Sequence, residues 1–492
     1  ELGEDIAKTI YQPILRSYRV TVEQMALLEP GLSETICATL LDVMREAMDE
    51  VVSRGVPAEA ARDFLLGHMT ILSAVIFKQI PGQFSDACNK AIIFGKETIL
   101  KPDWKRLFEP EEIRESVRRI CANFPGSYWR DLDSRRAYPD EFVQALIREG
   151  WLAAMIPEEY GGSGLSLTAG AVILEEIHRQ GCNAAACHAQ MYTMGTVLRH
   201  GSAEQKARYL PGIADGSLRL QAFGVTEPTS GTDTLSLKTT ARREGEEWVI
   251  NGQKIWTSRA EHSDLMVLLA RTTPREEAKS RTDGLSVFLV DMRGKLGNGI
   301  DIRPIRTMMN HATTEVFFDN LRIPADALVG EEGKGFRYIL SGMNSERILI
   351  AAECIGDAKW FLKKGADYAK ERVVFGAPIG RNQGVQFPLA RAQAHLMAAE
   401  AIVYRASAMY DAGHNPGVEA NTAKMLAADA SWEAAEACLQ THGGFGFAEE
   451  YDVERKFREA RLYQVAPIST NLILAYIAEQ VLGLPKSYGE GQ

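Results

Sequence analysis

The sequence lacks the features that would place it in a membrane or around a metal. It has no run of about 18 apolar residues, the length that a membrane-spanning helix needs. Its seven cysteines are scattered and odd in number, none forms a Cys-x-x-Cys pair, and its nine histidines show no metal-ligand spacing. We therefore expect no membrane span, no metal site and no disulfide framework, and a reducing, cytoplasmic location.

The chain also has too little positive charge for non-specific binding to nucleic acid or anionic membranes, because its formal net charge is −10. No Gly-x-Gly-x-x-Gly follows an apolar strand, which argues against a Rossmann site. The glycine-rich stretch 157–164 lacks the Gly-Lys-Ser/Thr ending of a P-loop. The residues from Glu1 to Asp5 resemble no signal peptide, and the absence of an initiator Met leaves the biological start open.

What the sequence does contain is a helical, β, helical order along 492 residues, a length typical of about three domains. Two helical stretches come first, a strand-like stretch follows, and long amphipathic helices return at the end. This order is not the βαβ alternation of a parallel sheet. It predicts a mostly α protein with an inserted β domain, in four parts: 1–108, 109–220, 221–328 and 329–492.

Local patterns predict individual elements within these parts. Capping residues, apolar periodicity and Pro-containing stops predict helices at 36–52, 58–79, 348–369 and 385–412. Short apolar runs predict strands at 265–270, 285–290 and 314–318. Alternating residues from Thr239 to Gly252 predict a hairpin whose tight turn is Asn251-Gly252.

Six separated motifs lie between residues 112 and 486. They are Ile156-Pro-Glu-Glu-Tyr-Gly-Gly-Ser-Gly164, Phe223-Gly-Val-Thr-Glu-Pro-Thr-Ser-Gly-Thr-Asp233, Asn251-Gly-Gln-Lys-Ile-Trp-Thr-Ser258, Leu328-Val-Gly-Glu-Glu-Gly-Lys-Gly-Phe336, Glu371-Arg-Val-Val-Phe-Gly376 with Gln383, and Gln440-Thr-His-Gly-Gly-Phe-Gly446. In this order they resemble the acyl-CoA dehydrogenase family. The resemblance implies a helical domain, a β-barrel-like middle domain and a C-terminal four-helix bundle, here preceded by an extra all-α domain.

The resemblance also implies an FAD site. A flavin ring is held by amides and hydroxyls of short loops at strand ends, and Thr226, Thr232 and Ser258 lie in such places, although turn capping is the commoner role of these residue types. The family places Trp256 beside the ring and Thr232 near the substrate. Further FAD contacts, shared with a neighbouring subunit, are implied for Arg372, Phe375, Gln383, Gln440, Gly443 and Gly444, and a looser match adds Ser469 and Asn471.

Each of these residues also has an ordinary structural interpretation. Arg372 suits a diphosphate because a guanidinium is a positive fork, but it could instead form a surface pair with Glu371. Glycines at 443 and 444 permit close approach of a cofactor, but they also suit a plain turn between helices. The joint occurrence of the motifs favours the cofactor interpretation.

The catalytic base departs from one family pattern and follows another. Many members carry a glutamate near the C-terminus, but here Pro467 occupies that position and the base is absent. Other members carry it on an earlier helix in a Glu-Arg pair, which places it at Glu346, with Arg347 beside the substrate. The alternative is a glutamate in the first turn of a helix, stabilised by the macrodipole. Burial would raise the pKa of such a base toward the working pH.

Pro467 raises a second question, because proline has no N–H to polarise the thioester oxygen. A neighbouring amide such as that of Ile468 is one candidate substitute, and the alternatives are weaker oxyanion stabilisation or a different reaction. The leading hypothesis is oxidation of an acyl-CoA to a trans-2-enoyl-CoA, with electrons passed to an electron-transfer flavoprotein, in a homotetramer or homodimer. A flavin oxidase or monooxygenase on the same fold, and a catalytically silent scaffold, are the alternatives.

Residues 1–108 resemble a different family, the helical C-terminal domain of phosphogluconate-dehydrogenase-like oxidoreductases. The resemblance rests on Val22–Thr35 and Ala58–His68. The NAD-binding half of that family would precede residue 1. Three interpretations remain open: a remnant of a bifunctional chain, two joined reading frames, or an interaction module. Glu34 and His68 are candidate site residues of that family, although a helix N-terminal Glu and a helical His are more often structural.

Overall fold

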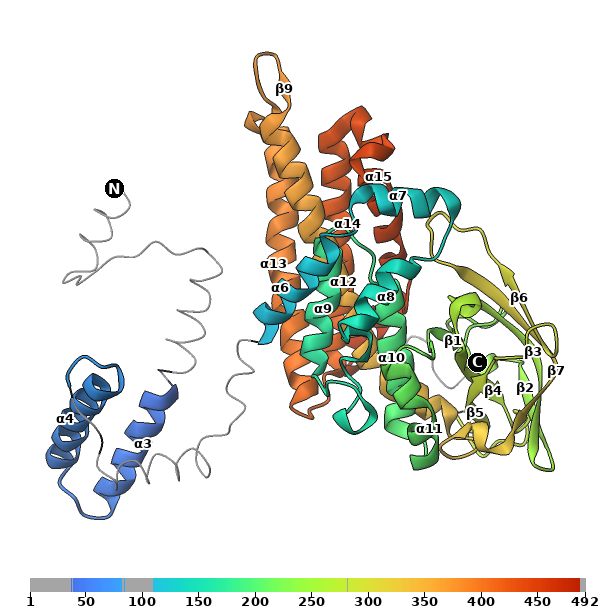
Figure 1. Cartoon of the computed structure of the whole chain (residues 1–492), viewed down its shortest axis with the longest axis horizontal. Coiled ribbons are helices and arrows are strands. Elements are labelled where there is room, and N and C mark those ends of the chain that lie inside the picture. Colours follow the sequence, from blue (N-terminus) through green and yellow to red (C-terminus); the bar gives the residue numbers. More distant parts are fainter. Residues whose placement is uncertain (1–36, 38, 82–83, 85–108, 281, 487–492) are drawn as a thin grey trace. The chain divides into compact units, whose positions relative to one another are not determined.

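The computed structural model describes residues 37, 39–81, 84, 109–280 and 282–486 (Figure 1). The chain divides into two compact units, residues 1–112 and 113–492, and each is described by itself. Over the described residues, no helix is both long and apolar enough to cross a bilayer. Within the same ranges, no three His, Cys, Asp or Glu side chains are grouped to hold a metal ion.

The first unit contains a helical hairpin. Helices α3 (Thr39–Ser53) and α4 (Ala58–Ile76) correspond to the two helices expected at 36–52 and 58–79. Arg45 pairs with Asp42 and Asp49 at 3.2 and 2.9 Å on the exposed face of α3. The expected cap around Ser33 and Glu34 lies outside the described residues.

A group of helices precedes the sheet of the second unit. The helices are α6 (Glu109–Cys121), α7 (Gly126–Arg135), α8 (Asp140–Arg148), α9 (Leu167–Arg179), α10 (Ala185–His200) and α11 (Ala203–Ala214). Helices α6 to α10 contribute to the apolar core of the bundle, whereas α11 packs into a separate core with strand residues. The Ser202 hydroxyl accepts a hydrogen bond from the Gln205 N–H, and the Gln205 side chain accepts one from the Ser202 N–H, so a capping box starts α11.

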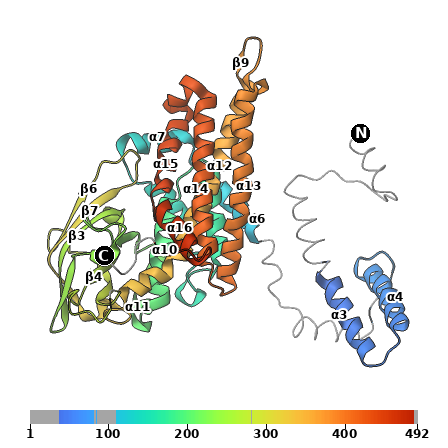
Figure 2. The same ribbon diagram turned by 180° about the vertical axis from the view of Figure 1, so that it is seen from behind.

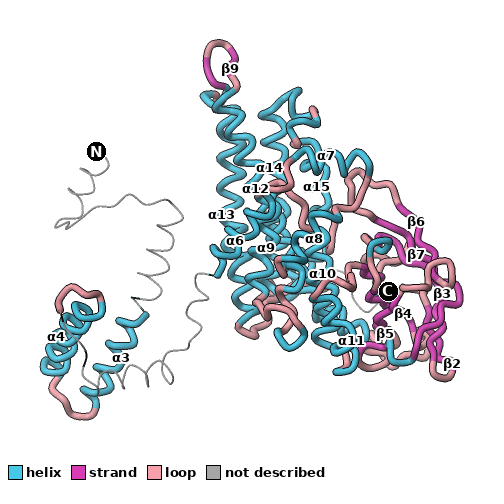
Figure 3. The backbone as a smooth tube through the Cα atoms, in the orientation of Figure 1, coloured by secondary structure: helices cyan, strands magenta, loops and turns pink. Residues whose placement is uncertain are grey.

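A mixed sheet of eight strands follows, in the order β6-β7-β3-β2-β4-β5-β8, with β1 added in parallel beside β4. Its strands gather on one side of the helices, as Figure 3 shows. The central strands β4 and β5 are buried on both faces, which explains why their sequences are continuous apolar runs. The strands are β1 (Ala222–Gly224), β2 (Thr240–Glu244), β3 (Glu247–Ser258), β4 (Leu265–Arg271), β5 (Leu285–Asp291), β6 (Ile300–Pro304), β7 (Thr313–Pro324) and β8 (Leu328–Val329).

The expected turn at Asn251-Gly252 is wrong. The hairpin turns at Gly245 and Glu246, and β3 runs on through Asn251 and Gly252 to Ser258. The pairing of β3 with β7 shifts register between Ile250 and Gly252. The Asn-Gly pair therefore marks a bulge, which uses the same backbone freedom as a turn. The three other expected strands are present as β4, β5 and part of β7.

The chain then returns to long helices that pack side by side into a bundle (Figures 1 and 2). A short hairpin of β9 (Val373–Val374) and β10 (Ala377–Pro378) joins the first two and projects from the end of the bundle. The helices are α12 (Gly335–Glu371), α13 (Gln383–Asp411), α14 (Gly417–His442), α15 (Val453–Ala460) and α16 (Thr470–Gln480).

Helix α12 starts earlier than the sequence pattern predicts. It has 37 residues and begins at Gly335 rather than near residue 348. A Cβ at Gly335 would lie 2.6 Å from the backbone of Ser286 on β5, so only glycine lets the helix start this close to the sheet. Packing on the β domain thus extends the helix beyond its apolar periodic segment.

Candidate active site

Glu346 lies in the interior of α12, because the helix begins eleven residues before it. The interpretation of Glu346 as a first-turn glutamate is therefore wrong. Its side chain is 8% exposed, and burial raises its pKa, opposed only by weaker attraction from His188 and Arg347. Arg347 is half-buried and donates a hydrogen bond to Asn344 at 3.1 Å.

Helix α10 brings further polar groups to Glu346 that the sequence motifs do not include. His188 lies 3.0 Å from Glu353, which is two turns beyond Glu346 on α12, and its Nε2 has no hydrogen-bond partner among the described residues. The His188 and Tyr192 rings meet edge to face at 5.1 Å. Burial and then the charge of Glu346 raise the pKa of Tyr192. No local pattern marks these residues, because they become neighbours of Glu346 only through helix packing.

The proposed flavin-ring residues come from two segments that the fold joins. The carbonyl of Thr226, in the loop after β1, accepts the N–H of Ile255 at 2.9 Å, which links this loop to the end of β3. Trp256 is 58% exposed, and Ser258 is half-buried with its hydroxyl 3.3 Å from that of Thr313. Thr232 is exposed in the same loop.

A buried ion pair holds this loop in place. Glu227 lies 2.8 Å from Lys254 and also accepts the backbone N–H groups of Lys238 and Thr239 at 2.6 and 2.9 Å. Burial lowers the pKa of Lys254 to about 8, despite its partner carboxylate. The glutamate of the Thr-Glu-Pro motif is therefore a structural anchor for Thr226 and Thr232.

The second group of proposed FAD residues gathers at the far end of the bundle. Arg372 directly follows the last residue of α12 and lies over the Phe445 ring at 5.6 Å. In the described part of the chain it forms no ion pair, so the alternative interpretation, a surface pair with Glu371, finds no support there. Phe375 is fully exposed on the β9–β10 hairpin, and Gln383 begins α13.

The adjacent end of α14 supplies the remaining residues of that group. Gln440 is exposed, and Gly443 adopts φ 56° and ψ −131°, which no other residue type adopts without strain. A Cβ at Gly443 or Gly444 would meet no atom within 4 Å, so both present open backbone. Figure 1 shows this end of the bundle pointing away from the sheet that carries Trp256, so one chain does not bring the two groups together.

The segment around Pro467 contains Ser469 and Asn471, which were expected to contact the cofactor. Ser469 caps α16, since its hydroxyl accepts the Leu472 N–H at 3.4 Å, and Asn471 is exposed in the first turn. Lys424 donates hydrogen bonds to the carbonyls of Tyr463 and Ile468 at 2.7 and 3.0 Å. Within the described residues, the Ile468 N–H has no hydrogen-bond partner.

The residues present fit an FAD molecule. A 58% exposed indole in the strand β3 and a fully exposed phenyl ring at Phe375 are large apolar surfaces that a bound group would cover. Arg372 offers an uncompensated positive fork beside open glycine backbone. These are the partners that an aromatic ring system and a diphosphate require.

The N-terminal candidates belong to the first unit. His68 lies exposed on α4, where it stacks on Phe64 at 4.2 Å and its Nδ1 lies 2.9 Å from the Phe64 carbonyl oxygen. Glu34 lies outside the described residues.

Models of known families match most of the chain. The models of the acyl-CoA dehydrogenase N-terminal, middle and C-terminal domains match residues 109–217, 222–321 and 333–482. The model of the phosphogluconate dehydrogenase (decarboxylating) C-terminal domain matches residues 1–121.

Individual relatives agree with these matches. The acyl-CoA dehydrogenase fadE12 of Mycobacterium bovis is 35% identical over 385 residues, which cover 77% of this chain and 97% of that protein. The glutaryl-coenzyme A dehydrogenase complex with glutaryl-CoA has a TM-score of 0.71 at 29% identity, over 78% of this chain and 98% of its own. The D-apionate oxidoisomerase of Cupriavidus necator is 75% identical over 120 residues, which are 24% of this chain and 44% of that protein.

The domain order, the fold and a relative matched over nearly its full length agree on one assignment. The chain belongs to the acyl-CoA dehydrogenase family, whose members are oxidoreductases with FAD as cofactor, and it carries in addition a domain of the phosphogluconate dehydrogenase C-terminal type.

Proposed function

We propose that the protein oxidises an acyl-CoA thioester to its trans-2-enoyl-CoA, with Glu346 as the base that removes the α-proton. The observation that carries this proposal is the environment of Glu346. It is a buried carboxylate without an ion-pair partner closer than 4 Å in the described structure, and burial raises its pKa. A structural glutamate in a bundle is normally paired, whereas a base needs a raised pKa.

FAD supplies the acceptor for the hydride that leaves the β-carbon. Trp256 would shield one face of the flavin from water, and Ser258, Thr226 and Thr232 would bind its polar edge from the loop that Glu227 and Lys254 hold. Arg347 lies beside the base and would contact the substrate. The free N–H of Ile468 would polarise the thioester oxygen in place of the missing amide at Pro467.

The remaining residues would bind the diphosphate and adenosine parts of FAD. Arg372, Phe375, Gln383, Gln440, Gly443 and Gly444 form one exposed surface at the bundle end, away from Trp256. We therefore propose that this surface serves the FAD of a second subunit in a homodimer or homotetramer. Ser469 and Asn471 are proposed as minor contacts. An electron-transfer flavoprotein would be the electron acceptor.

The test is an anaerobic titration of the purified flavoprotein with a panel of acyl-CoAs, followed by the loss of oxidised flavin absorbance. The wild type should be reduced by at least one thioester, and the product should be the enoyl-CoA. Glu346→Gln should keep its FAD and lose flavin reduction by about 10²–10⁴-fold, the usual contribution of a positioned base. Glu332→Gln, an exposed glutamate just before α12, is the control and should react normally.

Other outcomes separate the alternatives. Reduction of Glu346→Gln at the native rate would show that another group is the base. A yellow protein that no thioester reduces would contradict dehydrogenation and favour a flavin oxidase or monooxygenase. Purification without flavin would favour a silent scaffold.

A further inference from the structure

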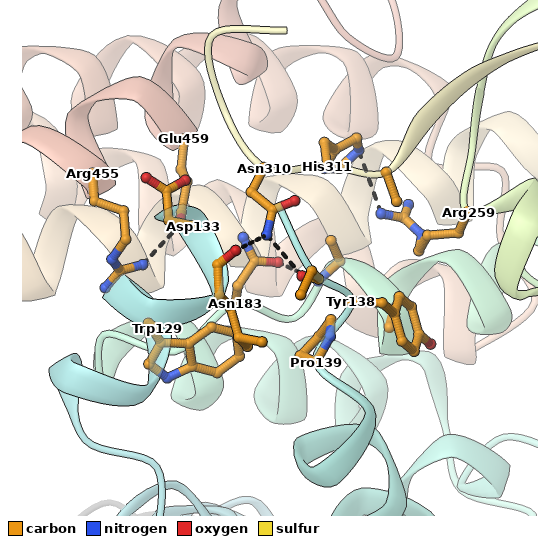
Figure 4. Close-up of a pocket in the computed structure, with 15 residues that line it drawn as sticks. Trp129, Asp133, Tyr138, Pro139, Asn183, Arg259, Asn310, His311, Arg455 and Glu459 are labelled. Carbon is orange, nitrogen blue, oxygen red and sulfur yellow. Dashed lines mark hydrogen bonds and ion pairs between the residues drawn. The ribbon is translucent and has the colours of Figure 1, made fainter. Parts of the chain in front are cut away.

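A pocket opens between the helical and β parts of the second unit, lined by residues of α7, α10 and α15 and of the two loops that follow β3 and precede β7 (Figure 4). The space inside it that is open to a water-sized atom is about 40 Å³. We call it the Arg259 pocket. Its polar lining includes Tyr138, Asn183, Arg259, Asn310, His311 and Arg455.

The carboxylates on this pocket already have cationic partners. Glu459 lies 2.8 Å from Arg455 and 3.1 Å from Lys456. Asp133 lies 2.6 Å from Arg458. In Figure 4, Arg455 and Glu459 lie on one side of the pocket, and Arg259 and His311 lie on the other.

Arg259 has no such partner. Its side chain is 7% exposed, and within the described residues it forms no ion pair. Glu353 is the carboxylate whose charge acts on it, but Glu353 faces His188 at 3.0 Å. Burial lowers the pKa of the Arg259 guanidinium, yet arginine stays charged in proteins. A buried, uncompensated cation is costly unless an anion pairs with it.

His311 adds a donor next to this cation. Burial, and then the charge of Arg259, hold the pKa of His311 well below its usual range, so the ring is neutral. Arg259 Nη1 donates to His311 Nε2 at 3.5 Å, which places the ring proton on Nδ1. His311 Nδ1 and Arg259 Nε are both buried without a hydrogen-bond partner among the described residues. Two donors without a partner, one of them cationic, therefore belong to residues that line the pocket.

Helix α10 links the pocket, which its residues Ala185 and Ala186 line, to His188 and Tyr192, which act on the proposed base. Arg259 directly follows Ser258, and Tyr192 interacts electrostatically with both Arg259 and Glu346, which moves the pKa of Tyr192. His188, edge to face with Tyr192, acts in the same way on the pKa values of Glu346 and His311. The surroundings of Glu346 and the pocket thus share one helix, α10.

We propose that Arg259 and His311 bind a carboxylate at the far end of the acyl group, so that the preferred substrates are CoA thioesters of dicarboxylic acids. This proposal rests on the function proposed above and specifies its substrate class. The guanidinium fork matches the two carboxylate oxygens, and the His311 Nδ1–H supplies an additional hydrogen bond.

The first test compares thioesters that differ only in this charge. Succinyl-, glutaryl- and adipyl-CoA and their methyl half-esters are titrated anaerobically into the FAD-loaded protein. The wild type should favour at least one carboxylate over its ester by about 10–100-fold in the second-order rate of flavin reduction, as expected of a charge-assisted hydrogen bond. Arg259→Met should lose this preference and keep the rate with the ester.

The matched control is Arg219→Gln. Arg219 lies over the Tyr138 ring at 5.4 Å but already pairs with Asp140 at 3.1 Å. The control should keep the preference for the carboxylate. A wild type that prefers the esters, or an Arg259→Met variant that still prefers the carboxylates, would overturn the proposal while leaving dehydrogenation intact.

A second test does not depend on flavin chemistry. Titration calorimetry of the FAD-loaded protein with free glutarate should show binding to the wild type and to Arg219→Gln, and at least tenfold weaker binding to Arg259→Met and His311→Phe. This binding result tests the carboxylate site even if no thioester reduces the flavin. A lack of flavin reduction would contradict only the proposed function. Absence of glutarate binding to the wild type, or equal binding of inorganic phosphate and glutarate at Arg259, would overturn it.

Discussion

The bundle and the proposed site treat buried charge in opposite ways. Between α9, α12 and α15, Asp357 lies 2.5 Å from Lys456 and accepts a hydrogen bond from the His178 ring at 2.9 Å. Burial alone would raise the pKa of Asp357, but Lys456 and His178 hold it at about 2. Along the site, Glu346 and Arg259 are equally buried and have no partner of opposite charge within ion-pair distance in the described structure. The charges between the bundle helices are thus paired, whereas the two charges at the proposed site are not.

The largest expected effect tests whether the paired charges of the bundle stabilise the fold. Lys456→Met should lower the free energy of unfolding by about 3–5 kcal/mol, because it leaves the Asp357 carboxylate buried without a cation. Urea denaturation of the FAD-loaded protein measures this loss. A loss below about 1 kcal/mol would place the pair among interactions of little net value.

The next effect concerns the exposed cation at the bundle end. Arg372→Ala should weaken FAD retention by about 10–100-fold, the loss expected for charge-assisted hydrogen bonds to a phosphate. Lys370→Ala, which removes a partner of Asp367 on the same helix end, is the control. Flavin released on dialysis gives the answer, and equal release by both variants would remove Arg372 from the diphosphate site.

A smaller effect follows from the raised pKa of Glu346. At a pH between the pKa values of this carboxyl in the unfolded and the folded state, the folded protein binds more protons than the unfolded chain. The free energy of unfolding therefore falls as the pH rises toward and through the folded-state pKa. Glu346→Gln lacks this group. It should match the wild type near pH 4.5 and exceed it at pH 8, by about 1.4 kcal/mol per unit of pKa shift. Denaturation at the two pH values tests this, and a variant less stable at pH 8 would contradict the burial argument.

The smallest expected effect is on the free energy of unfolding of Arg259→Met, and it is to be compared with that of Lys456→Met. Arg259→Met, the same kind of substitution as Lys456→Met, should change the free energy of unfolding by less than about 1 kcal/mol, since it removes an unpaired buried charge. The assay is again urea denaturation. A loss as large as that of Lys456→Met would assign Arg259 a structural role.

The sequence predicted the order of domains, the long helices and the central strands well, because continuous apolar runs and helical periodicity report burial directly. It placed the turn at Asn251-Gly252 wrongly, since the same residues serve a turn or a bulge. It missed the start of α12 at Gly335, which depends on contact with Ser286 of β5. Glu346 was proposed from its motif and stays a prediction, whereas His188, Arg259 and His311 come together only in three dimensions and leave no local signal.

The length of α12 has a consequence for how the cofactor is held. Arg372 follows Glu346 by 26 positions on this one helix, which corresponds to about 39 Å at 1.5 Å per residue. A rigid rod of that length keeps the base and the proposed diphosphate ligand of one chain too far apart to share one FAD. Each flavin would then take its ring contacts from one copy and its diphosphate contacts from another. FAD occupancy should therefore follow protein concentration, and dilution alone should release the flavin.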